Sequence, residues 1–388
     1  MRILGICYEF PPDTTPTANR TGKLLSRLPA EWDIDILTVP RNTQANGRFA
    51  IRTAAEGKPN SLVKWLRKVR LEKIGDALEF PDDKGPWVNS AFSEAMRMIQ
   101  SNRPDVIIAF MMPYSSGIIG TMLKKATGIP LIVNFDDSPT CIDMHPSYPS
   151  YFHYRKTVRF EDKLIQTADA VISVSRLNME RVRNRQPTEH QGKFNLIRYG
   201  ADPDDYLQPS APAPDQFRIV YIGGMTGWFE YYHRPGETTV LKKVYQAWNR
   251  FGRHYRARLD QRGSSPVILG EAIKSVLSRC PELKGKVRFD IYGNRYAERV
   301  VNKVLEHENL ISFTRVYGPI ANAGAVQTAR QADLLFMALP SRITPEPGGR
   351  ISAKTYEYLM TDRPILAAVP PGQEALPRAR RTGGDSPA

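Results

Sequence analysis

The chain has 388 residues, 41% of them hydrophobic, which is enough for two domains of ordinary size, and it contains no run of about 18 apolar residues that would span a bilayer. Its three cysteines, Cys7, Cys141 and Cys280, are scattered, which argues for a reducing compartment and against a disulfide framework or a zinc site. The formal charge of +14 indicates an anionic partner: a membrane surface, a nucleic acid or a phosphorylated substrate.

In the first half of the chain, short apolar runs alternate with helical patterns. The N-terminal apolar run is too short for a signal peptide and is predicted to be the first strand. Such alternation is typical of a parallel sheet covered by helices on both faces. Strands are predicted at Ile3–Tyr8, Ile34–Val39, Val106–Phe110, Leu131–Phe135, Ala170–Val174 and Asn195–Ile197, and helices at Ala18–Leu28, Trp87–Gln100 and Phe160–Thr167.

A polar, proline-rich stretch then interrupts the pattern, and a second series of strands follows. We therefore predict an α/β protein with two doubly wound Rossmann-like domains, 1–205 and 217–372, joined by a linker at 206–216 and facing across a cleft. Residues 373–388 are rich in Arg, Gly and Pro and are predicted to form a disordered tail. The later strands are predicted at Arg218–Ile222, Val287–Tyr292, Ile311–Thr314, Leu334–Met337 and Pro364–Ala368.

The most informative segment is Gly348–Leu359, in which a glycine turn opens a predicted helix. The unpaired amides and positive dipole end of a helix start suit a phosphate group. Glu357, one turn inside, could accept both hydroxyls of a ribose, and Lys354 lies on nearly the same face. The alternative is an ordinary surface Lys–Glu pair. The phosphate and ribose contacts predicted here are Gly349, Arg350, Ser352, Lys354 and Glu357.

A second glycine cluster follows the first strand of the second domain. Gly223 and Gly224 would let the backbone approach a phosphate, and Arg234 is the nearest cation that could reach it. The alternatives are a glycine pair without a ligand and a free surface arginine. We include all three residues among the predicted phosphate contacts.

In the first domain, polar residues follow two predicted strands. The loop from Phe10 leads through Asp13 to Arg20 on the first helix, which either faces an anion or is solvated. Asp136 and Asp137 follow another strand and would orient an acceptor hydroxyl or act as a base; the alternative is a helix or turn cap made by Asp137 or Ser138. His145 is either an acceptor-side residue or a solvated loop histidine.

Two segments carry much of the excess positive charge. Leu62–Arg70 combines an apolar helical stripe with basic side chains, which suits either an interfacial helix on anionic lipid or an ordinary packed helix. Lys242–Arg262 interleaves basic and aromatic residues, which would equally suit nucleic acid. We find no Walker loop, no metal-type His/Cys cluster and no Gly-x-Ser-x-Gly elbow, so hydrolase and kinase functions have little support.

Taken together, these segments resemble GT-B glycosyltransferases, specifically the family 4 group, in order along most of the chain. The matching elements are Phe10-Pro11-Pro12 with Arg20, Phe80-Pro81-Asp82-Asp83 with Trp87, Pro104–Ile107, Gly128–Val133, Asn134–Pro139, Ala168–Ile172, Tyr199–Asp202, Ala332–Leu335 and Lys354–Leu359. The Pro-Asp…Trp element and the segment at Asn134 resemble a bacterial subgroup that builds surface polysaccharides.

The resemblance implies a transferase of the hexosyltransferase type, retaining and metal-independent. A UDP- or GDP-linked sugar donor would be bound mainly by the second domain and a glycan or lipid-linked acceptor by the first, with no cofactor. Glu357 matches the second Glu of the family's Glu-x7-Glu motif. We expect a cytoplasmic protein without a nucleic-acid partner. Attachment to the inner membrane face as a peripheral protein is the alternative location.

The sequence also departs from the family pattern. The first Glu of the motif would fall at position 349, which is Gly349, and Phe110-Met111-Met112 stands where the family has a catalytic-type histidine. The helices that usually end the family are not recognisable, so the C-terminus is expected to be shortened. These departures leave two alternatives to the enzyme open: a degenerate nucleotide-sugar-binding protein and a basic nucleic-acid-binding protein.

Overall fold

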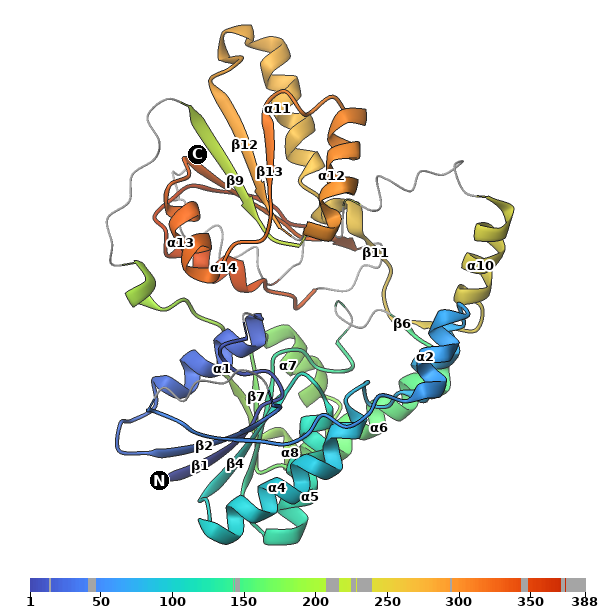
Figure 1. The fold of residues 1–388 in the computed structure, drawn as a ribbon, viewed down its shortest axis with the longest axis vertical. Coiled ribbons are helices and arrows are strands. Elements are labelled where there is room, and N and C mark those ends of the chain that lie inside the picture. Colours follow the sequence, from blue (N-terminus) through green and yellow to red (C-terminus); the bar gives the residue numbers. More distant parts are fainter. Residues whose placement is uncertain are drawn as a thin grey trace. The chain divides into compact units, whose positions relative to one another are not determined.

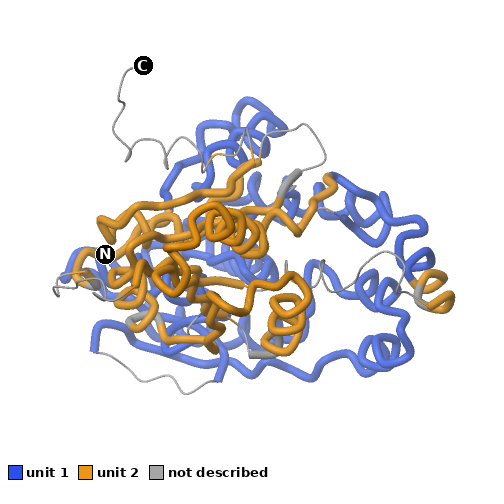
Figure 2. The backbone as a smooth tube through the Cα atoms, turned by 90° about the horizontal axis from the view of Figure 1, so that it is seen from above, with its two compact units in different colours: residues 1–198, 246–256 blue, residues 199–245, 257–388 orange. Residues whose placement is uncertain are grey.

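The computed structural model describes residues 1–13, 15–40, 47–141, 143, 147–206, 216–224, 228, 239–293, 295–342, 348–370 and 374. The chain divides into two compact units, each taken by itself below. Unit 1 comprises Met1–Arg198 and Gln246–Arg256, and unit 2 comprises Tyr199–Tyr245 and Ala257–Ala388 (Figure 2). Two predicted site residues, His145 and Arg234, lie outside the described residues, as do 207–215 of the predicted linker and 375–388 of the predicted tail.

Unit 1 is built on a seven-stranded parallel sheet with the strand order β3-β2-β1-β4-β5-β7-β8 (Figure 1). Its strands are β1 (Arg2–Ile6), β2 (Asp33–Thr38), β3 (Ala50–Thr53), β4 (Val106–Met111), β5 (Leu131–Phe135), β7 (Ala170–Ser173) and β8 (Phe194–Leu196). Its helices are α1 (Pro16–Ser26), α2 (Ser61–Lys68), α3 (Glu72–Leu78), a 3-10 turn (Gly85–Trp87), α4 (Val88–Ser101), α5 (Ser115–Thr127), α6 (Tyr151–Thr167), α7 (Arg176–Arg183) and α8 (Thr188–Gln191).

Both faces of this sheet are buried, as the apolar strand runs predict. Leu4 and Ile6 of β1 belong to a large core cluster with residues of α4, α5 and α6. Ile34 and Ile36 of β2 pack in a second cluster with Leu25 of α1. Successive side chains of a strand point to opposite faces, so the two clusters are the two sides of one sheet.

Unit 2 repeats this architecture with a five-stranded parallel sheet in the order β13-β12-β9-β14-β16. Helices α11 and α12 contribute to one core cluster of the unit, and α13 and α14 contribute to another. Its elements are β9 (Phe217–Ile222), β12 (Val287–Tyr292), β13 (Thr314–Tyr317), β14 (Leu334–Ala338), β16 (Ile365–Ala368), α11 (Val267–Arg279), α12 (Arg295–His307), α13 (Asn322–Arg330), α14 (Ala353–Leu359) and 3-10 turns at Pro203–Tyr206, Gln261–Ser264 and Pro281–Leu283.

Short elements complete the described fold. In unit 1, β6 (Ser147–Tyr148) pairs with β10 (His254–Tyr255), and in unit 2, β11 (Leu259–Asp260) pairs with β15 (Ser341–Arg342), both antiparallel. Helix α10 (Val240–Arg250) ends in unit 1. None of the described helices is both long and apolar enough to cross a membrane.

Each parallel sheet has a point where the strand order reverses. In unit 1, β1 lies between β2 and β4, and in unit 2, β9 lies between β12 and β14. In doubly wound sheets, ligands bind outside the carboxyl ends of the strands at such a point. The predicted fold class is confirmed, and it directs attention to the segments that follow β1, β4, β9 and β14.

Two predicted elements are wrong in their bounds by three or more residues. The strand predicted at Ile311–Thr314 runs from Thr314 to Tyr317, because these residues pair with β12, whereas Ile311 is exposed in the preceding turn. The helix predicted from Phe160 begins nine residues earlier, at Tyr151, where the side chain of Ser150 accepts a hydrogen bond from the His153 amide. This N-cap supplies the start signal.

Candidate functional site

The candidate donor site in unit 2 begins at the glycines that follow β9. The Gly223 amide donates to the Tyr292 carbonyl of β12 (3.0 Å), and the Tyr221 hydroxyl donates to the Gly224 carbonyl (2.9 Å). These bonds fix the backbone where β9 ends, at the reversal point of the sheet. The predicted glycine segment is therefore in the place where a doubly wound sheet binds its ligand.

Helix α14 is held against the same strand ends. The Ile222 amide donates to the Tyr358 hydroxyl (3.1 Å), and the Thr355 hydroxyl lies 3.2 Å from the Met337 sulfur on β14. From the other side, the Tyr206 hydroxyl donates to the Glu357 carbonyl (3.1 Å). The helix that carries Lys354 and Glu357 is thus anchored to both β9 and β14.

Lys354 reaches from α14 to the glycines. Its ammonium lies 4.6 Å from the centre of the Tyr221 ring, in a cation–π arrangement. It also lies so close to Gly223 that a Cβ there would overlap it. Burial, together with the nearby Arg350 guanidinium, lowers the pKa of the Lys354 ammonium to about 8, while Glu357 acts in the opposite direction. The Lys354 ammonium and the Gly223 backbone therefore lie side by side at the end of β9.

The glycine turn before α14 is well packed. Gly348 and Gly349 are buried, and the Glu374 amide donates to the Gly348 carbonyl (3.0 Å). Ser352 occupies the N-cap position of α14 with extended backbone dihedrals, but its side chain makes no capping hydrogen bond. Arg350 is half-buried, and its charge acts on both Tyr221 and Lys354.

The electrostatics of this cluster suit an anion. Arg350 and Lys354 are near enough for one to lower the pKa of the other, which costs free energy in the absence of a negative partner. Glu357, the nearest carboxylate on α14, is partly exposed and offsets the repulsion only in part. Two cations beside an exposed glycine backbone form the kind of arrangement that stabilises a phosphate.

In unit 1, the predicted residues Arg20 and Asp136 meet. The Arg20 guanidinium on α1 donates to an Asp136 carboxylate oxygen (2.7 Å), to the Asn134 side chain (3.1 Å) and to the Ile197 carbonyl (3.3 Å). Both charged side chains are almost fully buried. The solvated alternative for Arg20 is wrong, because its guanidinium is buried in an ion pair that joins α1 to the residue after β5.

The neighbouring carboxylate has a different environment. Asp137 is partly exposed, and its backbone carbonyl accepts a hydrogen bond from the Tyr114 hydroxyl (3.3 Å), which comes from the segment after β4. Asp13 lies in a turn after β1, where its amide donates to the Phe10 carbonyl (3.1 Å). Of the two predicted catalytic carboxylates, Asp137 is therefore the more accessible.

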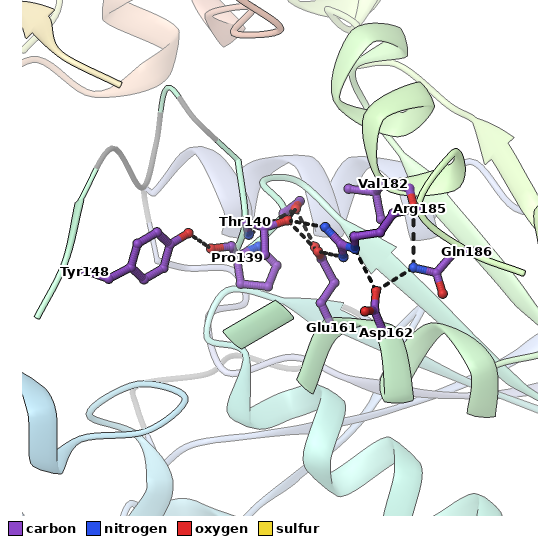
Figure 3. Close-up of polar contacts among 9 residues, drawn as sticks. Pro139, Thr140, Tyr148, Glu161, Asp162, Val182, Arg185 and Gln186 are labelled. Atoms are coloured by element: carbon purple, nitrogen blue, oxygen red, sulfur yellow. Dashed lines mark hydrogen bonds and ion pairs between the residues drawn. The ribbon is translucent and has the colours of Figure 1, made fainter. Parts of the chain in front are cut away.

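Sequence reasoning missed a buried network around the segment that follows these carboxylates in the chain (Figure 3). The Glu161 carboxylate on α6 is fully buried and accepts hydrogen bonds from the hydroxyls of Ser138 and Thr140 and from the Arg185 guanidinium. Arg185 also pairs with Asp162 (2.8 Å). Ser138 also accepts from the Thr140 amide (3.2 Å), as the turn-cap alternative predicts. The network fixes the segment that immediately follows Asp137.

The Pro-Asp…Trp element has a structural role in the same unit. The Asp82 carboxylate accepts hydrogen bonds from the Ser115 amide (2.9 Å) and hydroxyl (2.6 Å) at the N-terminus of α5. Trp87 is fully buried and packs edge-on against Tyr8, with ring centres 5.1 Å apart.

Within the described residues, no group of three or more His, Cys, Asp or Glu side chains could hold a metal ion.

The fold of the chain is similar to folds of known proteins. Solved structures similar to the chain include sucrose-phosphate synthase from Thermosynechococcus elongatus, with 12% identity, a TM-score of 0.59, and 98% of this chain and 88% of that chain covered. Anabaena HepE in complex with UDP-glucose follows, with 12% identity, a TM-score of 0.53 and coverages of 95% and 80%. WaaG, a glycosyltransferase involved in lipopolysaccharide biosynthesis, has 10% identity, a TM-score of 0.53 and coverages of 94% and 80%.

These likenesses show the fold, which is that of GT-B proteins. Residues 17–192, which lie in unit 1, match the model of the glycosyl transferase 4-like domain. No sequence among the curated proteins matches the chain. The resemblance expected from the sequence is therefore confirmed, and the match of residues 17–192 supports glycosyl transfer as the general activity.

Proposed function

We propose that the protein is a glycosyltransferase that moves a sugar from a nucleotide-sugar donor to a hydroxyl acceptor. The observation that carries the proposal is the cluster of Lys354, Arg350 and the Gly223 backbone at the strand-order reversal of unit 2. Anabaena HepE, one of the similar structures, is in complex with UDP-glucose, which supports a uridine diphosphate as the carrier; a guanosine diphosphate is the alternative carrier.

The donor is proposed to bind through its pyrophosphate and its ribose. The phosphates would rest against Gly223, Gly224 and the segment 349–352, with Lys354 and Arg350 as counter-charges. Glu357 would accept hydrogen bonds from the ribose hydroxyls. As the sugar leaves, negative charge grows on the diphosphate, and fixed cations stabilise it most strongly at that moment.

The acceptor is proposed to bind unit 1. Asp137, the accessible carboxylate at the end of β5, would accept a hydrogen bond from the acceptor hydroxyl and orient it. Asp136 would act indirectly, by holding Arg20 through their buried ion pair. A retaining, metal-independent reaction and a glycan or lipid-linked acceptor complete the proposal. The support is the family resemblance and, for the acceptor, the role of WaaG in lipopolysaccharide biosynthesis.

Nucleotide titration is the direct test of the donor site. We expect UDP or GDP to raise the thermal midpoint of the wild-type protein, and we expect Glu357→Ala to weaken binding about tenfold through lost ribose hydrogen bonds. Glu306→Ala, at an exposed position near the end of α12, serves as the control and should bind normally. Absence of a response to every nucleotide and nucleotide sugar would refute the proposal.

One observation favours a second candidate, a nucleotide-sugar-binding protein without turnover. Gly349 stands where the resembling family has the first Glu of its motif, so a donor-sugar contact is missing from the described site. Product formation distinguishes the two candidates. Incubation of radiolabelled UDP- and GDP-sugars with lipid-linked and free glycan acceptors should yield a labelled product if the protein is an enzyme, and bound donor alone if it is not.

A further inference from the structure

Two basic segments that are far apart in the sequence lie together in unit 1. Lys73 of α3 donates to the Phe251 carbonyl just after α10, and its ammonium lies 5.7 Å and 5.6 Å from the ring centres of Trp248 and Phe251. Arg253 pairs with Asp76 of α3 (3.5 Å). Figure 1 shows the end of α10 beside α2. The two segments that the sequence presents as separate candidates therefore form parts of one surface.

The N-terminal end of α6 joins the same assembly. β10 pairs with β6, which places His254 beside α6, where its ring stacks on Tyr154 with centres 4.7 Å apart and meets Tyr151 edge-on at 5.1 Å. The Arg256 guanidinium lies 5.2 Å from the centre of the Tyr154 ring. We call the surface formed by α2, α3, 246–256 and Tyr151–Arg159 the basic–aromatic surface.

Large apolar side chains on this surface face solvent. On α2, Val63 and Leu66 are buried and hold the helix in place, while Leu62, Trp65 and Val69 stay exposed, Trp65 at 55%. Phe152 at the start of α6 is 67% exposed, and Phe251 after α10 is 72% exposed. Trp248 on α10 is also exposed. Clusters of this kind on a soluble protein mark an interaction site.

Positive charge surrounds these side chains. Lys64, Lys68 and Arg70 are exposed on and after α2, and Arg155, Lys156 and Arg159 are exposed on α6. Asp76 of α3 pairs with both Arg67 and Arg253, and Glu79, just after α3, pairs with Arg67, while Glu72 is the remaining acidic residue of α3. From Val240 to Arg256 the sequence contains no acidic residue. The surface therefore carries a net positive charge with apolar groups at its centre.

We propose that the basic–aromatic surface docks on an anionic lipid bilayer. Exposed aliphatic side chains such as Leu62 and Val69 decide between lipid and nucleic acid. Single-stranded nucleic acid uses aromatic rings for stacking and basic groups for phosphates, and it has no use for aliphatic groups. In a bilayer, aliphatic and aromatic groups enter the acyl boundary while lysines and arginines attract anionic headgroups.

This inference deepens the proposed function, on which it rests in one respect: a lipid-linked acceptor is presented at a membrane, and docking would bring unit 1 to it. The residues involved take no part in the proposed donor site. Vesicle binding and nucleotide binding can therefore fail independently, and a protein that binds UDP but no vesicle would refute this inference alone.

Vesicle flotation tests the docking. The probes are phosphatidylcholine vesicles with and without about 30 mol% phosphatidylglycerol. We expect the full-length protein to float at least tenfold more with the anionic vesicles at low salt, and to detach as ionic strength rises towards about 0.5 M. Equal recovery with neutral and anionic vesicles, or no flotation, would overturn the proposal.

Variants separate this surface from the overall charge. Lys64→Glu with Lys68→Glu should abolish flotation, whereas Lys284→Glu with Lys286→Glu, the same charge change on exposed residues of unit 2, should leave it intact. Trp65→Ser with Phe251→Ser should reduce flotation at unchanged net charge. Circular dichroism and UDP affinity should match wild type throughout. If the two charge-reversal variants lose flotation equally, or if a single-stranded oligonucleotide binds the wild type more tightly than the vesicles do, the proposal fails.

Discussion

The ammonium of Lys354 and the backbone of Gly223 occupy neighbouring positions that leave no room for a side chain at residue 223. The lysine comes from α14 and the glycine from the end of β9, so two segments that are far apart in the sequence meet at the reversal point of the unit 2 sheet. This relationship explains why glycine is needed at the end of β9: a larger residue would displace the cation that we assign to the donor phosphates.

Gly223→Ala is therefore expected to weaken nucleotide binding without unfolding the protein. The added methyl group would push aside the flexible end of Lys354, which costs little stability, but the ammonium would leave its position near the phosphates. We expect UDP affinity to fall about tenfold in isothermal titration, with a nearly unchanged thermal midpoint. Gly192→Ala, at a position with open space around it, is the control. Normal affinity in Gly223→Ala would show that the contact has no part in binding.

Nucleotide affinity should depend on pH through Lys354. The pKa of its ammonium is about 8 in the folded protein without ligand, below its ordinary value of 10.5. The positive charge is present below pH 8 and is lost as the pH rises, so UDP affinity should decrease by roughly tenfold between about pH 7.5 and 9.5. Lys354→Met should bind UDP weakly and show a flat profile over this range. A wild-type profile as flat as that of the variant would refute the assignment.

The same shift has the opposite consequence for the stability of the protein without nucleotide. Between pH 8 and 10.5 the unfolded chain holds the Lys354 proton more tightly than the folded chain does, so the free energy of unfolding gains from this group as the pH rises through that window. In Lys354→Met this gain should be absent. Urea denaturation of both proteins at several pH values measures this gain. The free energy of unfolding should rise more with pH in the wild type than in Lys354→Met, and an equal change in both proteins would contradict the assignment.

Much of this fold follows from local sequence. The apolar runs predict β5 and β12 with their observed bounds. Asp136 and Gly223 each directly follow a strand, and a parallel sheet gathers the carboxyl ends of its strands at one edge. Longer-range partners are a different matter. Nothing near Arg20 in the sequence indicates that Asp136, 116 residues later, neutralises it in the interior.

The same limit applies to Glu161 and to α10. Glu161 looks like a solvated residue on an amphipathic helix, and only the tertiary structure reveals the hydroxyls and the guanidinium that surround it. α10 comes after β9 in the sequence, but the residues from Gln246 to Arg256 lie in unit 1. Pairing of β10 with β6 decides that location, and a two-residue strand leaves no recognisable periodic pattern.

The buried Arg20–Asp136 pair should be important for stability. Arg20→Met leaves the Asp136 carboxylate buried without its cation, and the free energy of unfolding should fall by about 3–5 kcal/mol. Removal of both charges in Arg20→Met with Asp136→Asn should cost clearly less than the sum of the single changes. Urea denaturation measures this double-mutant cycle. Arg2→Met, which removes a more exposed ion pair with Asp33, is the control and should cost at most about 1 kcal/mol. Additive losses in the cycle would show that the two side chains act separately.

Glu161 should influence catalysis through the position of Asp137. Glu161→Gln keeps the size of the side chain but weakens its bond to Arg185 and disturbs the Ser138 and Thr140 hydroxyls, so the segment after Asp137 should shift. If Asp137 orients the acceptor hydroxyl, kcat should fall about tenfold in Glu161→Gln and about a hundredfold in Asp137→Asn. The donor Kd should remain unchanged in both variants, because the donor residues lie in unit 2. The double variant should be no slower than Asp137→Asn alone, since Glu161 acts only through that carboxylate. A further loss of rate in the double variant, or a change in donor Kd, would assign Glu161 a different role.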